Sequence, residues 1–197
     1  MPSKKIEATW CEIYDKFVDD AWFIGRSTLG GLPEEAYLGL CIAGEAGEVL
    51  DKVVRDFPAR PDIIDERGLI LELGDLLYYV TRYLHKLDTA LTAVIQYNAV
   101  RENLCKSEVE LPIVVIATMH VSCQACAISE RLKKAYRDSS GKIDRIAMIG
   151  TSATVVLYIE WCALLIGMKL EDVARWNVTK LKDRAERGVM RGEGDDR

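Results

Sequence analysis

The chain has few side chains of the kinds that bind iron or zinc, since only two of its 197 residues are histidine. Carboxylate-bridged iron sites in helical bundles use Glu-x-x-His pairs, and neither His85 nor His120 follows an acid at that spacing. The six cysteines are scattered through apolar segments, which favours small buried residues in a reducing compartment over a disulfide framework. Cys123 and Cys126 have the spacing of half a zinc site, but no second Cys or His pair follows them. The sequence therefore argues against iron, zinc and disulfide chemistry.

Long apolar runs and an excess of basic charge are also lacking. A membrane span needs about 18 consecutive apolar residues, and the longest candidate, residues 151–167, is interrupted by Glu160. The first ten residues have no apolar segment of the kind found in a signal peptide. The formal net charge of −5 argues against a general nucleic-acid binder. We therefore expect a cytoplasmic protein that binds neither membranes nor nucleic acid.

Apolar residues recur at three- and four-residue steps along most of the chain, which is typical of amphipathic helices. The pattern predicts an all-α protein built as a helical bundle. Only residues 113–116 resemble a short strand, and they could equally begin a helix. The predicted helices of the first half cover about residues 6–24, 33–56, 69–86 and 89–103, with a loop over 57–68.

The second half of the sequence resembles the first. A shift of 82 places residues 48–56 on 130–138 with five of nine identical, and beyond the connector a shift of 79 places Asn98 on Asn177. This similarity predicts an internal duplication, with two homologous helical units forming a pseudo-dimer within one chain, and it leaves open a homodimer of such pseudo-dimers. The expected organisation is a first unit over residues 1–108, a degenerate second unit over 109–188, and a disordered tail over 189–197.

Two acidic pairs lie in otherwise apolar helical segments, Glu45-x-x-Glu48 and Glu72-x-x-Asp75. Residues three apart share one side of a helix, and carboxylates are seldom buried without a partner. Four acids that face one another across two helices need a cation, and oxygen ligands suit Mg²⁺ or its substitute Mn²⁺. Of the four positions, only Glu48 keeps an acid in the second half, as Glu130. The sequence therefore predicts one complete metal site, in the first unit.

The strings GEAGEVLDK and ELGDLLYYV, which hold these acids, resemble the MazG-like all-α nucleoside triphosphate pyrophosphohydrolases of the dUTPase-like superfamily. The later segment Asn177–Arg184 resembles a further element of that family, Asn-x-x-Lys-Leu-x-x-Arg. The resemblance implies Mg²⁺-dependent hydrolysis of a nucleoside triphosphate to the monophosphate and pyrophosphate, with a dUTP-type substrate as a variant. It also implies that the four acids are catalytic.

Substrate contacts are predicted from both halves. Lys52 follows Glu48 by one helical turn and could meet a phosphate, although it could equally pair with Glu48 itself. Lys180 and Arg184 could bind phosphates from the second half, and Asn98 or Asn177 could contact sugar or base. Two alternatives stay open: a nucleotide sensor that binds without turnover, and a non-catalytic helical scaffold whose acids bind a basic partner.

Overall fold

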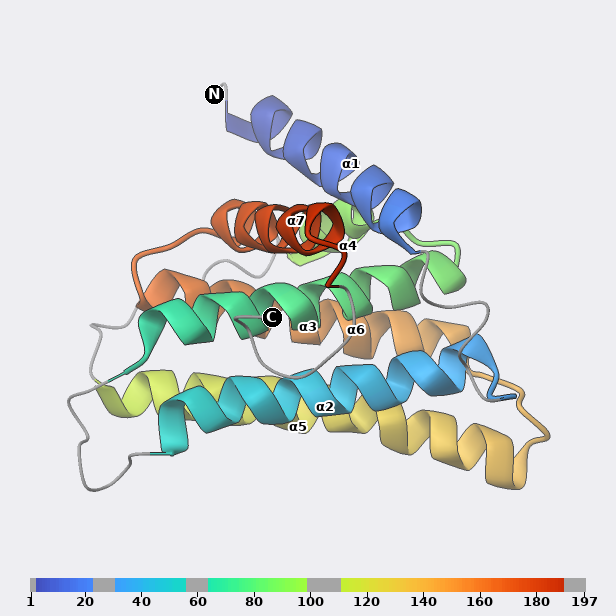
Figure 1. Cartoon of the computed structure of the whole chain (residues 1–197). Coiled ribbons are helices and arrows are strands. Elements are labelled where there is room, and N and C mark those ends of the chain that lie inside the picture. Colours follow the sequence, from blue (N-terminus) through green and yellow to red (C-terminus); the bar gives the residue numbers. More distant parts are fainter. Residues whose placement is uncertain (1–2, 23–30, 56–63, 99–110, 190–197) are drawn as a thin grey trace.

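Every regular element of the computed structural model is a helix (Figure 1). The structure describes residues 3–22, 31–55, 64–98 and 111–189, and contains no strand within those ranges. The all-α prediction is confirmed, and the alternative of a strand at residues 113–116 is wrong because these residues lie inside a helix. The helices are α1 (Ser3–Ala21), α2 (Glu34–Val54), α3 (Glu66–Lys86), α4 (Leu91–Asn98), α5 (Leu111–Asp138), α6 (Arg145–Leu165) and α7 (Leu170–Glu186).

The helices form three layers, as Figure 1 shows: α2 and α5 at one side, α3 and α6 in the middle, and α1, α4 and α7 at the other side. Contacts of α2 with α3 and α5, and of α6 with α3 and α5, close a four-helix core. Of the remaining helices, α7 covers α3, α4 covers α6, and α1 contacts α3, α4 and α7. Helix α7, which covers α3, therefore belongs to the predicted second unit, and α4, which covers α6, belongs to the first.

Helix starts repeat at the offset that the duplication predicts. Asp65 accepts a hydrogen bond from the Gly68 backbone N–H at 2.8 Å, and Asp144 accepts one from the Ala147 N–H at 3.0 Å. Each aspartate thereby satisfies one of the N–H groups that a helix start leaves without a partner. The two caps are 144 − 65 = 79 residues apart, and α4 and α7 begin 170 − 91 = 79 residues apart. This correspondence supports the duplication, which stays a prediction.

One hydrophobic core runs through both predicted units. It joins fully buried side chains of the first unit, such as Leu38 and Leu73, to those of the second, such as Ile128 and Ile159. Burying an aliphatic side chain contributes about 1.5–3 kcal/mol, so the shared core stabilises the two units together. The predicted boundary at 108 and the tail from residue 190 lie outside the described residues.

The cysteines only partly follow the sequence-based expectation. Cys11 and Cys162 are buried, but Cys123 and Cys126 are exposed on α5, and none of the four forms a disulfide. The expectation of buried residues is therefore wrong for the Cys-x-x-Cys pair. Residues three apart on a helix share a side, and here that side faces away from the core.

Two helices are long and apolar enough to cross a membrane by length and composition, namely residues 113–138 of α5 and all of α6. The sequence-based expectation of no membrane span rested on Glu160, which does not take α6 below this limit. The finding is weak because buried core helices meet the same criterion. Helix α6 has that character, with nine buried residues and contacts to four other helices.

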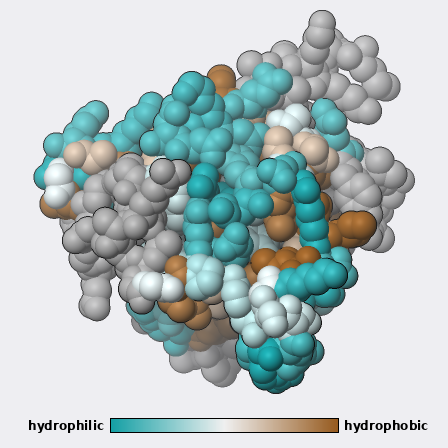
Figure 2. Space-filling view, turned by 90° about the vertical axis from the view of Figure 1, so that its right-hand side faces the viewer, coloured by the Kyte–Doolittle hydropathy of each residue, from teal (hydrophilic) through white to brown (hydrophobic). Residues whose placement is uncertain are grey.

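The end of the bundle where α2 begins and α3 ends is largely hydrophilic, with the hydrophobic residues in small separate patches (Figure 2). Ion pairs between α2 and α3 lie at this end: Arg82 binds Glu34 at 2.7 Å, and Lys86 binds Glu34 at 3.1 Å. Burial raises the pKa of Glu34, but hydrogen bonds from Arg82 and Lys86 outweigh burial and lower it. These contacts fasten the open end of the hairpin formed by α2 and α3.

Candidate metal centre

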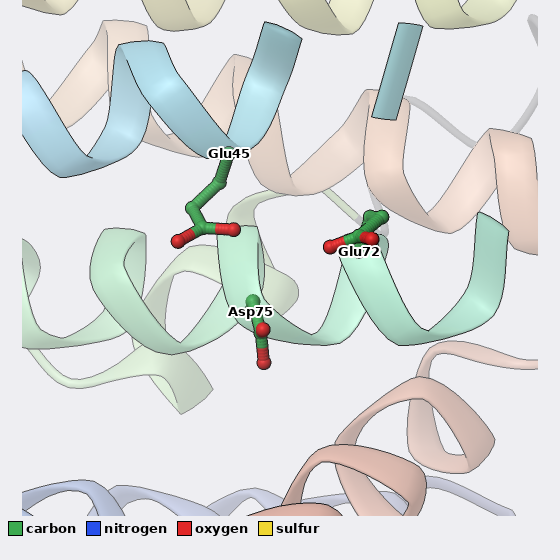
Figure 3. Close-up of side chains that lie close together, drawn as sticks. All are labelled: Glu45, Glu72 and Asp75. Carbon is green, nitrogen blue, oxygen red and sulfur yellow. The ribbon is translucent and has the colours of Figure 1, made fainter. Parts of the chain in front are cut away.

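Three of the four predicted acids converge where α2 faces α3. Glu45 extends from α2 toward α3, which carries Glu72 and Asp75 (Figure 3). One oxygen from each carboxylate lies within 4.8 Å of the others. Glu72 is 2% exposed, whereas Glu45 and Asp75 are half-buried. The described residues thus contain an all-oxygen cluster of the kind that hard divalent cations prefer.

Glu48 lies outside this cluster. It is exposed on α2, although its charge is close enough to contribute to the raised pKa of Glu45. Successive helical residues are about 100° apart, so side chains three apart diverge by about 60°. Of these two acids of α2, Glu45 extends toward α3 (Figure 3), whereas Glu48 is exposed. The role of Glu48 as a ligand stays a prediction.

Two lysines approach the cluster from different units. Lys52 of α2 pairs with Glu72, with 3.1 Å between Nζ and Oε1, and Lys180 of α7 pairs with Asp75, with 2.8 Å between Nζ and Oδ2. The sequence offered Glu48 or a phosphate as partners for Lys52, whereas the structure pairs it with an acid on the neighbouring helix. The three carboxylates are therefore accompanied by two ammonium groups.

The third carboxylate, Glu45, is left with little compensation. Burial raises the pKa of Glu45 to about 8, and the charges of Asp75, Glu48 and Glu72 add to this effect, while Lys180 opposes it. A carboxyl group at that pKa holds a proton at neutral pH when no cation is bound. The site is thus short of positive charge, which a divalent ion would supply.

Asn177 and Tyr14 complete the surroundings of Asp75. Asn177 Nδ2 donates to Asp75 Oδ1 at 2.9 Å, and the Tyr14 hydroxyl donates to Asn177 Oδ1 at 3.0 Å. Asn177 is fully buried, and Gly74 allows α7 this close because a Cβ there would stand 3.0 Å from the Asn177 Cβ. The structure therefore brings Asn177 and Lys180, both predicted as substrate contacts, onto one carboxylate of the acidic cluster, that of Asp75.

The other predicted substrate contacts are placed less directly. Arg184 lies one turn beyond Lys180 on α7 and is 4% exposed. Asn98 is the last residue of α4, and its side chain lies outside the described part of the chain. The contacts of Arg184 and Asn98 with substrate stay predictions.

A thiol next to the acids is not a nucleophile. Burial raises the pKa of Cys41 to about 11; a hydrogen bond with Tyr37 opposes this rise and the charge of Glu45 adds to it. The reactive form of cysteine is the thiolate, which is scarce at neutral pH under these conditions. Covalent thiol chemistry is therefore not what the site offers.

Sequence reasoning missed Tyr14 and His85. The spacing of His85 in the sequence indicates no acidic partner, but its two ring nitrogens lie 2.7 Å from Asp15 and 2.9 Å from Asp19 on α1. Asp15 also accepts from the Leu91 backbone N–H, at the start of α4, at 3.0 Å. These contacts hold α1 against α3 and α4. Nothing local in the sequence indicates them, because the partners are 66 to 76 residues apart.

Comparison with known proteins matches the chain to "Gene 37 protein" of Mycobacterium phage L5, at 30% identity over 83 residues. The match covers 41% of this chain and 73% of the phage protein. No family model matches the chain, and no solved structure matches it. The resemblance to MazG-like pyrophosphohydrolases therefore rests on the residues of the chain itself.

Proposed function

This chain belongs to the family of the Gene 37 protein of Mycobacterium phage L5, and we propose that it is a Mg²⁺-dependent nucleoside triphosphate pyrophosphohydrolase. The reaction would hydrolyse the bond between the α- and β-phosphates and release a nucleoside monophosphate and pyrophosphate. A deoxynucleotide such as dUTP belongs to the same substrate class.

The observation that carries the proposal is the charge balance of the acidic cluster. Three carboxylates, Glu45, Glu72 and Asp75, have one oxygen each within 4.8 Å of the others, and among the described residues Lys52 pairs with Glu72 and Lys180 with Asp75. Burial, followed by the charges of Asp75, Glu48 and Glu72, raises the pKa of Glu45 to about 8. Oxygen ligands of this kind suit Mg²⁺ and Mn²⁺ and disfavour the softer metals. The three acids would hold the ion.

Such an ion would neutralise charge on the polyphosphate and lower the pKa of a bound water. The chain's own groups support the same chemistry. Lys52 of α2 pairs with Glu72 and Lys180 of α7 pairs with Asp75, and an ion that neutralises these two acids would free both ammonium groups to meet phosphate oxygens. Two cations at different acids suit a triphosphate better than a single phosphate.

The test is pyrophosphate release from a panel of ribo- and deoxynucleoside triphosphates, with and without Mg²⁺, for the parent chain, Glu72→Gln and Glu66→Gln. Glu66 lies on the same helix but is exposed, so its variant has the same charge change away from the cluster. We expect Mg²⁺-dependent turnover that falls at least about a hundredfold in Glu72→Gln, as expected when a group binding the catalytic ion is lost. Glu66→Gln should keep the parent rate.

Other outcomes decide between this function and its alternatives. Mg²⁺-dependent nucleotide binding without pyrophosphate release would identify a sensor. No nucleotide binding by a folded protein would leave a scaffold, in which the acids contact a basic partner. Equal rates for Glu72→Gln and Glu66→Gln would remove the cluster from the reaction.

A further inference from the structure

Tyr14 lies at the end of a hydrogen-bond chain that reaches the acidic cluster. Its hydroxyl donates to Asn177 Oδ1 at 3.0 Å, and Asn177 Nδ2 donates to Asp75 Oδ1 at 2.9 Å. Tyr14 is 2% exposed and Asn177 is fully buried, so water does not compete for these bonds. The three residues come from α1, α7 and α3, which are far apart in the sequence.

The order of donors in this chain is fixed by chemistry. The Asp75 carboxylate accepts only, so Asn177 must turn its NH₂ group toward it and its carbonyl oxygen away. That oxygen then needs a donor, and the Tyr14 hydroxyl supplies one. Burial, followed by the charge of Asp75, raises the pKa of Tyr14 well above its ordinary value, so the hydroxyl keeps its proton. Tyr14 thereby holds Asn177 in the one orientation that serves Asp75.

We propose that Tyr14 is a positioning residue of the metal centre, which acts through Asn177 to fix the carboxylate of Asp75 for its role as a ligand. The inference rests on the proposed metal site. Asn177 takes one lone pair of Oδ1 and Lys180 takes one of Oδ2, so each oxygen keeps a second lone pair for a cation. Outer partners of this kind orient metal ligands, and their loss lowers metal affinity about 10–100-fold.

Helix α1 is anchored so that it can perform this task. The neighbouring residue Asp15 binds His85 at 2.7 Å and the Leu91 N–H at 3.0 Å, which ties α1 to α3 and α4. Tyr14 itself packs in the main core, with its ring 6.3 Å from that of Phe17. Helix α1, at the start of the first predicted unit, therefore supplies part of the support for the site.

The test is Mn²⁺ binding, measured by titration calorimetry, to the parent chain, Tyr14→Phe and Tyr83→Phe. Tyr83 is an equally buried tyrosine whose hydroxyl has no hydrogen-bond partner among the described residues, so its variant removes the same atom without breaking a bond. We expect the Kd for Mn²⁺ to rise about tenfold in Tyr14→Phe, the lower end of the range for outer partners, and to stay unchanged in Tyr83→Phe. A loss of thermal stability in Tyr14→Phe with an unchanged Kd would overturn the proposal.

A double-mutant cycle tests the route through Asn177. In an Asn177→Ala background, Tyr14→Phe should have no further effect on the Kd, because the link to Asp75 is already broken. Additive effects of the two substitutions would overturn the assigned route. If the parent chain binds no Mn²⁺, the metal site fails and the inference fails with it. Mn²⁺ binding by the parent that Tyr14→Phe leaves intact refutes the inference alone.

Discussion

The contact of α3 with α7 at Gly74 should control both stability and the metal site. A Cβ at position 74 would lie 3.0 Å from the Asn177 Cβ and 3.4 Å from the Val173 carbonyl oxygen. Both atoms belong to the backbone of α7 or are fixed to it, so no side-chain rotation relieves the contact. In Gly74→Ala, helix α7 must therefore move by a few tenths of an ångström, and the 2.9 Å bond from Asn177 to Asp75 must lengthen.

Two opposing effects set the size of the change. Replacing glycine by alanine inside a helix contributes about 1 kcal/mol of stability. Overfilling a packed contact costs about 1–3 kcal/mol. Because the obstructing atoms are backbone, we expect the cost to prevail and Gly74→Ala to lose about 1 kcal/mol net.

The matched control is Gly150→Ala on α6, where a Cβ would meet nothing within 4 Å. That variant should gain about 1 kcal/mol, so the two variants should differ by about 2 kcal/mol, or about 4–8 °C in Tm for a chain of this size. The measurements are thermal unfolding and Mn²⁺ titration at a temperature where both variants are folded. Gly74→Ala should also bind Mn²⁺ more weakly than the parent. If Gly74→Ala is as stable as Gly150→Ala and keeps the parent's Kd for Mn²⁺, the packing argument is refuted.

Two further predictions concern pH. With the pKa of Glu45 near 8, a bound ion must displace its proton, so Mn²⁺ affinity should rise about tenfold per pH unit below that value and level off above it. A Kd for Mn²⁺ that stays constant from pH 6 to 9, measured by titration calorimetry, would contradict this expectation. Burial lowers the pKa of His85, but the hydrogen bonds to Asp15 and Asp19 outweigh burial and raise it. The folded chain therefore binds the His85 proton more tightly than the unfolded chain does. The folding stability gained in this way is complete below the unfolded pKa of about 6.5 and is lost as pH rises through the folded pKa. Urea unfolding at pH 5.5 and 8.5 should show that His85→Gln loses about 2 kcal/mol less stability than the parent over this interval, on the scale of one charge-assisted hydrogen bond. The buried Glu45, whose pKa is also raised, contributes a further loss that both proteins share.

The sequence predicted the elements well because helical periodicity is a local signal. It also predicted that Glu45 would meet Glu72 and Asp75, since two apolar helices joined by a short connector pack as a hairpin and their acids then face each other. The pattern did not separate Glu45 from Glu48, because that requires knowing that α5 occupies another side of α2.

The periodicity of apolar residues does not predict contacts between segments that are distant in the sequence. The bond from Tyr14 to Asn177 joins residues 163 apart. Tyr14 shares its spacing with ordinary core positions of α1, so an amphipathic pattern predicts burial for it but not a polar partner. His85 was missed for the same reason, because its partners lie on a helix that begins the chain.

Each half of the chain supplies a helix that covers the middle helix of the other half, which explains how one site can depend on both halves. Helix α7 packs on α3 and delivers Asn177 and Lys180 to Asp75. Under the predicted offset, Glu72 and Asp75 correspond to Thr151 and Thr154, whose hydroxyls donate to carbonyl groups of their own helix, at 2.8 and 2.9 Å. A hydroxyl that donates to a carbonyl group of its own helix has its hydrogen-bond partner there, and being uncharged it needs no cation. The second unit can therefore lose its acids without leaving buried charge, while it must keep α7, since removing α7 would leave the Asp75 carboxylate without its amide and ammonium partners.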